Sequence, residues 1–134
     1  MTNSRALACF ISRPMSGVSY AEDCQLILDI KKAAKEAGMY HFRVMNSWSG
    51  PQVPLRIMNP RLYRLGRAIS QMAEADIIIF VDGCWDIAKG CAVELEAYEK
   101  YKDCYADQWA AYIYSPVDKT LTLYRRAEKN EQST

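Results

Sequence analysis

The chain has 134 residues, of which half are apolar and a quarter charged, and its formal net charge is +1. This length suits one domain that buries a core of its own without disulfides or metals. The near-neutral charge and the lack of a long basic run give no electrostatic reason to expect nucleic-acid binding.

The first part of the chain predicts a strand, a helix and a second strand. Ala6–Ser12 is a short apolar run that ends at Arg13-Pro14, which is typical of a buried strand and too short for a membrane span. Ser19–Glu22 has the Ser-x-x-Glu pattern of a capping box and opens a helix that should stop at Gly38. Tyr40–Met45 alternates apolar and polar residues, which predicts the second strand.

The middle of the chain holds one long irregular segment, Asn46–Met58, and loops of this length are usually functional lids or disordered. Asn59-Pro60 then places an N-cap and a proline where a second helix should begin. Ile77–Val81 predicts a third strand, and a helix should run from about Lys89 to Cys104.

The last part predicts two more strands, Trp109–Tyr114 and an edge strand Thr120–Arg125, followed by a flexible tail over residues 127–134. Alternating strands and helices predict an α/β fold: a single Rossmann-like or flavodoxin-like three-layer sandwich with a mostly parallel sheet of about five strands. We therefore expect one domain over residues 1–126.

The five cysteines form no C-x-x-C pair and lack the spacing of a metal site. An odd number of cysteines without a secretory leader predicts reduced thiols in a cytoplasmic protein. Cys84 and Cys91 flank the loop after the third strand, so they are either a metal or redox pair or small buried packing residues.

Residues 75–101 are the most informative stretch. The apolar strand stops at Asp82, a short polar loop follows, and the next helix carries Glu94 near its start. Ligands of open α/β sheets bind beyond the carboxyl ends of the strands. Backbone N–H groups and the helix dipole should keep Glu94 ionised there. Glu94 is therefore either a catalytic carboxylate or a solvated helix residue.

The loop itself offers further candidates, each with two interpretations. Asp86 either caps the following helix or takes a catalytic or sugar-binding role, and Asp82 either completes the turn with Gly83 or binds a ligand. Trp48 and Trp85 either sandwich a base or pack beneath their own loops.

The loop Ser12–Gly17, between a strand and a capped helix, is a candidate cradle for phosphate or ribose, although it lacks the Gly-x-Gly-x-x-Gly pattern. Arg13 in this loop either faces a ligand or forms a surface ion pair. One turn beyond Glu94, Tyr98 either packs in the core or hydrogen-bonds a carboxylate.

Ile11–Gly17 reads Ile-Ser-Arg-Pro-Met-Ser-Gly, close to the pattern Ser-Gly-Pro-Met-[Ser/Thr]-Gly after a first strand. Residues 75–95 hold an Ala-Asp strand and then Gly90 four residues before the Glu of a Glu-Leu step. Together, and with Asn59-Pro60 before a helix, these segments resemble the nucleoside 2-deoxyribosyltransferase-like superfamily, in particular a short, largely uncharacterised branch met in phage and bacterial genomes. The likeness covers roughly residues 6–114.

This resemblance implies that Glu94 attacks the anomeric carbon of a nucleoside, releases the base and forms a glycosyl-enzyme, which a second base or water then resolves. Carboxylates are competent nucleophiles at such centres. Asp86 is the favoured acid for the departing base, with Asp82 as the other local candidate. The expected substrate-binding residues are Ser12, Arg13, Met15, Gly17, Trp48, Asp82, Trp85, Lys89 and Gly90.

We expect a nucleoside or nucleotide as the only ligand, with no cofactor, no metal, no nucleic acid and no membrane. The resemblance implies a homodimer or a larger homo-oligomer. Three tyrosines near the last strands suit either such an interface or the core: Tyr112, Tyr114 and Tyr124.

Two positions depart from the superfamily. Arg13 stands where glycine is usual, and Ala88 stands six residues before Glu94, where members acting on 5′-monophosphates carry serine and the transferases carry aspartate. The substrate class therefore stays open, and so does transfer against hydrolysis. The alternatives are a non-catalytic nucleotide-binding or sensor module of the same fold and a pure interaction protein.

Overall fold

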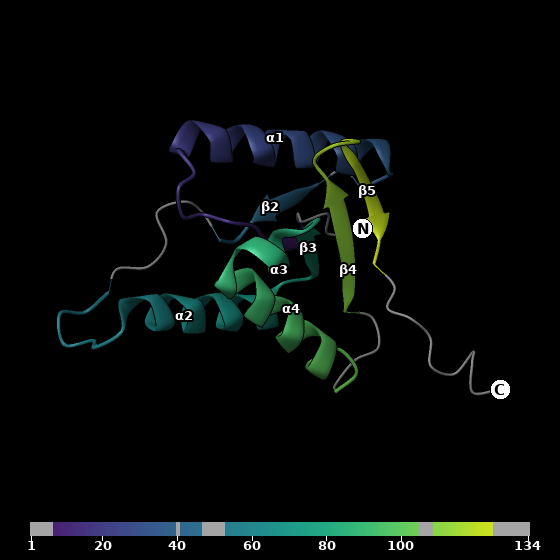
Figure 1. Ribbon diagram of the computed structural model, residues 1–134. Helices are drawn as coiled ribbons and strands as arrows, with labels where there is room; N and C mark the ends of the chain where they lie inside the picture. Colours follow the sequence, from purple (N-terminus) through teal and green to yellow (C-terminus); the bar gives the residue numbers. More distant parts are fainter. Residues whose placement is uncertain (1–6, 40, 47–52, 105–108, 125–134) are drawn as a thin grey trace.

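A computed structural model describes residues 7–39, 41–46, 53–104 and 109–124 (Figure 1). Its strands are β1 (Leu7–Ser12), β2 (Phe42–Val44), β3 (Ile77–Val81), β4 (Ala110–Ser115) and β5 (Thr120–Leu123). Its helices are α1 (Tyr20–Glu36), α2 (Pro60–Glu74), α3 (Cys84–Ile87) and α4 (Lys89–Tyr101). Among these described residues, no helix combines the length and apolar character needed to cross a membrane.

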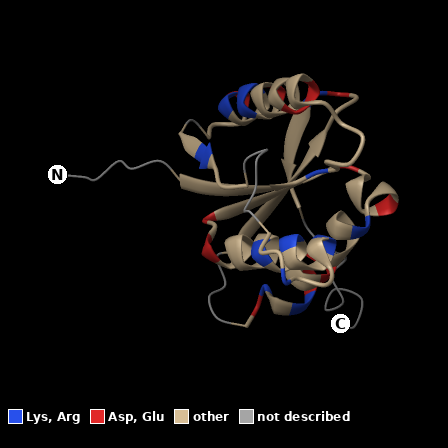
Figure 2. Ribbon diagram, turned by 90° about the vertical axis from the view of Figure 1, so that its left-hand side faces the viewer, with Lys and Arg blue, Asp and Glu red and all other residues tan. Residues whose placement is uncertain are grey.

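The five strands form one sheet in the order β2-β1-β3-β4-β5, with β5 alone antiparallel to its neighbour. Helix α1 covers one face and helices α2 and α4 cover the other, so the molecule has three layers (Figures 1 and 2). Figure 2 shows the charged residues mainly on the outer helices, while the central sheet carries few. The predicted α/β sandwich with a mostly parallel sheet is confirmed.

Strands β1 and β3 lie side by side at the centre, with Cys9 opposite Ile77 and Ser12 opposite Phe80. Every residue of β3 is buried, because both faces of a parallel sheet are covered by helices. This burial explains why the apolar run Ile77–Val81 predicted the strand at its observed bounds.

Local signals place the helix ends. The Ser19 hydroxyl accepts a hydrogen bond from the Glu22 N–H at 3.1 Å, and the Glu22 carboxylate accepts one from the Ser19 N–H at 2.8 Å, which confirms the capping box. After α1, Gly38 takes a φ of 94°, which favours glycine. The Asn59 side chain caps α2 by accepting from the Leu62 N–H at 3.0 Å.

The segment after β3 differs from the prediction. It forms the short helix α3, which begins directly after Gly83 (φ 82°), where a loop was expected. The N-cap of α4 is Ala88, so the interpretation of Asp86 as that cap is wrong. Helix α4 ends at Tyr101, three residues before the predicted end at Cys104.

The strand order places a topological switch point between β1 and β3. The chain leaves β1 for β2 on one side, whereas β3 lies on the other side of β1. Helices that follow such neighbouring strands diverge onto opposite faces, and ligands of α/β proteins bind in the resulting crevice. The residues that end β1 and follow β3 are therefore the first place to look for a site.

Some predicted features fall on residues that the structure does not describe. Trp48 and the tail over residues 127–134 lie outside the described ranges. The irregular segment Asn46–Met58 is described only at its two ends, and the last predicted residue of the edge strand, Arg125, is also outside.

Candidate functional site

Glu94 lies in the second turn of α4 and is buried, with 8% of the residue exposed. The hydroxyl of Ser12, the last residue of β1, donates a hydrogen bond of 2.6 Å to Glu94 Oε1. Ser12 is itself almost fully buried. This pair joins the end of β1 to the helix after β3, at the switch point of the sheet. The solvated-residue interpretation of Glu94 is therefore wrong.

Burial dominates the electrostatics of Glu94. Desolvation raises its pKa from 4.5 to about 7, while the Ser12 hydroxyl and the charge of Arg13 act in the opposite direction. Burial therefore outweighs the helix N-terminus that was expected to keep Glu94 ionised, because Glu94 lies beyond the first turn, where the helix dipole has little effect. A carboxyl with this pKa can accept or release a proton near neutral pH.

Cys84, the first residue of α3, contacts Ser12. Its thiol donates to the Ser12 carbonyl oxygen at 3.4 Å, and its Sγ lies 3.8 Å from the Ser12 hydroxyl. A hydrogen bond with the Cys91 thiol lowers the pKa of Cys84 and raises that of Cys91. Both thiols are free and lie in the core cluster. In the described ranges, no group of three or more His, Cys, Asp or Glu could hold a metal ion.

Arg13 turns away from this pair into a buried ion pair with Asp23 of α1. Its Nε and Nη2 atoms donate to the two carboxylate oxygens at 2.6 and 2.9 Å. Two further bonds reach the backbone oxygens of Ile11 at 3.2 Å and Asn46 at 3.1 Å. The guanidinium side chain is 0% exposed. Arg13 therefore ties β1, α1 and the segment after β2 together, so neither the ligand-facing nor the surface ion-pair interpretation describes it.

Asn46 completes this clamp. Its side-chain amide accepts from the Ile11 N–H at 3.1 Å and donates to the Ile11 carbonyl at 2.7 Å, so it pairs with β1 as a further strand residue would. Asn46 and Asp23 had no predicted role. For Asp23 a signal existed, since it lies in helical phase with the apolar residues Ile27 and Ile30 of α1.

The rest of the first loop is more open. Met15 is half-buried and Gly17 is exposed with a φ of 79°. The Val18 N–H donates to the Met15 carbonyl at 3.3 Å and closes a turn. Of the predicted binding residues in this loop, Ser12 and Arg13 are thus engaged within the protein, whereas Met15 and Gly17 lie nearer the surface.

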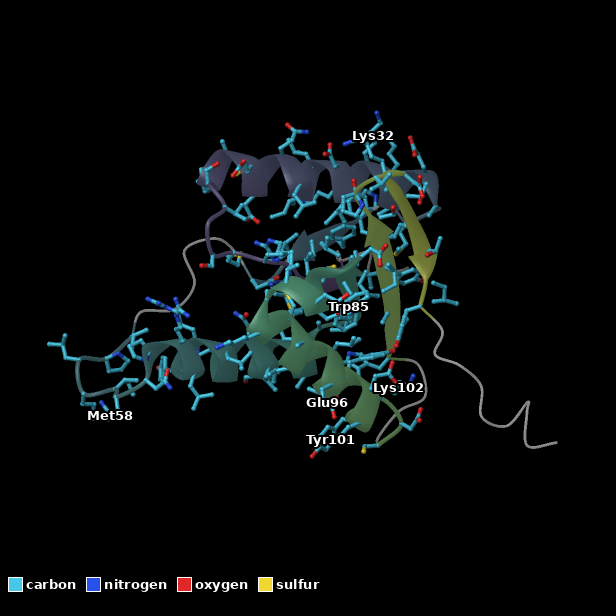
Figure 3. The ribbon with its side chains drawn as sticks, viewed as in Figure 1. Lys32, Met58, Trp85, Glu96, Tyr101 and Lys102 are labelled. Carbon is cyan, nitrogen blue, oxygen red and sulfur yellow. The ribbon has the colours of Figure 1, made fainter. Side chains whose placement is uncertain are left out.

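The predicted binding residues after β3 also differ in whether they are exposed or packed within the protein. Asp82, Asp86 and Lys89 are exposed, and Gly90 is half-buried. Trp85 is half-buried, packs against both core clusters and meets Phe80 edge-on with ring centroids 6.5 Å apart (Figure 3). For Trp85 the interpretation as a packing residue is therefore the one that fits.

The tyrosines also pack inward. The Tyr98 hydroxyl donates to the Trp109 carbonyl at 2.6 Å and does not reach Glu94, and burial raises its pKa to about 12. Tyr114 is buried and Tyr112 half-buried, while the Tyr124 hydroxyl donates to the Glu99 carboxylate. Tyr114 cannot contribute to an interface as suggested, because it belongs to the core.

No family model, no curated protein and no solved structure matches this chain. The sequence resemblance to the nucleoside 2-deoxyribosyltransferase-like superfamily therefore has no independent support and stays a prediction. What the protein does must be inferred from its own residues and their geometry.

Proposed function

We propose that this protein breaks the N-glycosidic bond of a nucleoside or nucleotide, with Glu94 as a covalent nucleophile. The observation that carries the proposal is a single buried carboxyl at the switch point between β1 and β3, held by the Ser12 hydroxyl at 2.6 Å. A carboxyl held in one orientation in a poorly solvated place is suited to attack a sugar carbon.

In the first step an oxygen of ionised Glu94 forms a bond to the anomeric carbon, while the bond from that carbon to the base nitrogen breaks. The electron pair goes to the base, which takes a proton from an acid. In the second step a second base or water attacks the same carbon and gives its proton to the conjugate base of that acid, while the bond from the carbon to Glu94 breaks and Glu94 leaves as the carboxylate. With a pKa of about 7, Glu94 is ionised in about half of the molecules at neutral pH.

Asp86 is the proposed acid for the departing base, with Asp82 as its rival. Both are exposed and follow β3 within a few residues of the switch point, and Asp86 lies in α3, between Cys84 and α4. Since Asp86 does not cap α4, its side chain is not committed to that helix end.

The polar groups of the first loop bear on the substrate class. Because Arg13 donates four hydrogen bonds inside the protein, its charge is not directed at a 5′-phosphate. Lys89 is an exposed cation at the start of α4. Arg13 therefore gives no reason to prefer a monophosphate, whereas Lys89 is a cation that a phosphate could meet, so both substrate classes belong in the test.

The second candidate function is a non-catalytic nucleotide-binding or sensor module. Burial favours the protonated form of Glu94, which is not nucleophilic, and Ala88 offers no polar side chain to the sugar. Such a module would bind a nucleoside or nucleotide and leave its glycosidic bond intact.

The test is base release from a panel of ribo- and deoxyribonucleosides and their 5′-monophosphates, with and without a second free base, followed by chromatography. We expect Glu94→Ala to lose at least about a thousandfold in rate, as removal of a nucleophile does. Glu96→Ala is the matched control, because Glu96 is exposed on the same helix and forms an ion pair with the equally exposed Lys100.

Dependence of release on the second base would indicate a transferase, and release in water alone a hydrolase. Equal activity of wild type and Glu94→Ala would contradict the proposed nucleophile. If no substrate loses its base while one ligand raises the melting temperature of the wild type, the binding module is the better account.

A further inference from the structure

We propose that Ser12 is the positioning residue of Glu94: its hydroxyl holds the carboxyl at the end of β1 and does not bind the substrate. This inference rests on the proposed function, in which Glu94 is the reacting group. It differs from the sequence prediction, which placed Ser12 among the substrate-binding residues.

Among its side-chain contacts in the described residues, the Ser12 hydroxyl lies nearer to Glu94 than to Cys84. It donates to Glu94 at 2.6 Å, a short distance for a hydroxyl donor, and Ser12 is 1% exposed. The Cys84 thiol contacts both oxygens of Ser12, at 3.4 Å for the carbonyl and 3.8 Å for the hydroxyl. Ser12 is therefore enclosed between α3 and α4, and its hydroxyl proton is taken up by the bond to Glu94.

The bond also decides how much of Glu94 is ionised. The charged and titratable groups around the carboxyl, among the described residues, are Arg13 at the end of β1, Cys84 in α3 and Cys91 one turn earlier in α4. Arg13 is paired with Asp23, and its charge still lowers the pKa of Glu94, although less than the Ser12 hydroxyl does. Ser12 gives the only hydrogen bond recorded to Glu94 in the described part of the chain, and it stabilises the charged form against burial.

A positioning role predicts a change in the pH dependence and not in substrate affinity. Without the hydroxyl, Glu94 should titrate about one to two pH units higher, the shift that corresponds to a hydrogen bond to a charged group. At pH 7 the ionised fraction, and with it kcat, should then fall about fivefold to fiftyfold. KM should stay within about a factor of two, because Ser12 does not touch the substrate.

The first experiment measures the titration of Glu94 directly and without any substrate. The protein is labelled with ¹³C at the glutamate side-chain carboxyls, the Glu94 signal is assigned with Glu94→Gln, and its shift is followed by NMR from pH 4 to 10. We expect a midpoint near 7 in the wild type and near 8 to 9 in Ser12→Ala. Ser12→Thr restores the hydroxyl and should return the midpoint toward that of the wild type.

Ser70→Ala is the matched control, because Ser70 is exposed on α2, away from the site. Thermal melts of each variant show that it is folded. Equal midpoints in wild type and Ser12→Ala would overturn the proposal, as would a wild-type midpoint in the ordinary glutamate range near 4.

The second experiment uses the pH–rate profile of base release. A raised KM in Ser12→Ala with an unmoved profile would return Ser12 to substrate binding and overturn the proposal. The two ideas fail in different ways. A protein that releases no base contradicts the proposed function while the NMR titration still decides whether Ser12 controls Glu94.

Discussion

Two buried carboxylates on opposite sides of the sheet are held by neighbouring residues of the chain and are held very differently. Asp23 in α1 receives two bonds from the guanidinium of Arg13, whereas Glu94 in α4 receives one bond from the hydroxyl of Ser12. Consecutive side chains of a strand point to opposite faces, so Ser12 reaches one helix layer and Arg13 the other. The charge of Asp23 is balanced by the cation of Arg13, whereas the charge of Glu94 meets only the neutral hydroxyl of Ser12 among these contacts.

The difference separates structure from chemistry. A paired and fully bonded charge in a core is stable and unreactive, and its purpose here is to tie three segments together. A buried carboxyl without a cationic partner keeps a strongly shifted pKa, which is the usual property of a catalytic acid or base. This contrast supports Glu94 as the proposed reacting group and gives Arg13 a structural role.

The largest expected effect comes from breaking the Asp23 pair. Arg13→Met leaves a buried carboxylate without its cation, which should cost about 3–5 kcal/mol of unfolding free energy in urea titrations. Adding Asp23→Leu removes the orphaned charge and should recover most of that loss. If Arg13→Met alone is as stable as the wild type, the ion pair with Asp23 does not stabilise the fold.

The second prediction concerns how the protein's free energy of unfolding depends on pH through the titration of Glu94. Between pH 4.5 and about 7 the native carboxyl keeps a proton that the unfolded chain has already lost, so wild-type stability falls as the pH rises through this window. Glu94→Gln cannot titrate. Its stability relative to the wild type should therefore rise by about 3 kcal/mol between pH 4 and pH 8.

Chemical denaturation of both proteins across this pH range is the measurement, and the wild-type curve is the internal control. A constant difference between the two proteins would show that the native pKa of Glu94 equals the unfolded one. The burial seen in the structure would then have no electrostatic consequence.

The smallest expected effect is the loss of stability when the Asn46 side chain beside Arg13 is removed. Asn46→Ala leaves both backbone polar groups of Ile11 without their side-chain partner, although the carbonyl keeps its bond from Arg13. The loss should be about 1–3 kcal/mol in the same urea titrations. A loss below about 0.5 kcal/mol would mean that water replaces the amide fully.

Elements with strong local signals were predictable from sequence. The bounds of β3 match because a run of five apolar residues is buried on both faces, and Ser19 and Asn59 start their helices through bonds to residues three positions away. The α3 turn was missed because Cys84–Ile87 is only four residues long, too short for a helical period to show in the sequence, and the preceding Gly83 suits a loop equally well.

The candidate site was only partly predictable. Glu94 and Ser12 were both singled out, yet neither was assigned to the other, since they lie 82 residues apart in the chain. Arg13 was expected to face a ligand or solvent, because the helical phase of Asp23 with Ile27 and Ile30 does not show which side chain an inward carboxylate will meet. Pairings between distant side chains depend on which faces of the sheet the helices cover.

The alternation of long strands and helices, the apolar strands and the starts of α1, α2 and α4 follow from the amino-acid sequence, because each depends on neighbours within a few residues. The pairing of Ser12 with Glu94 and of Arg13 with Asp23 follows from the fold, because the order β2-β1-β3 brings the ends of distant segments together. The same packing removed water from Glu94 and raised its pKa, which no local pattern could show.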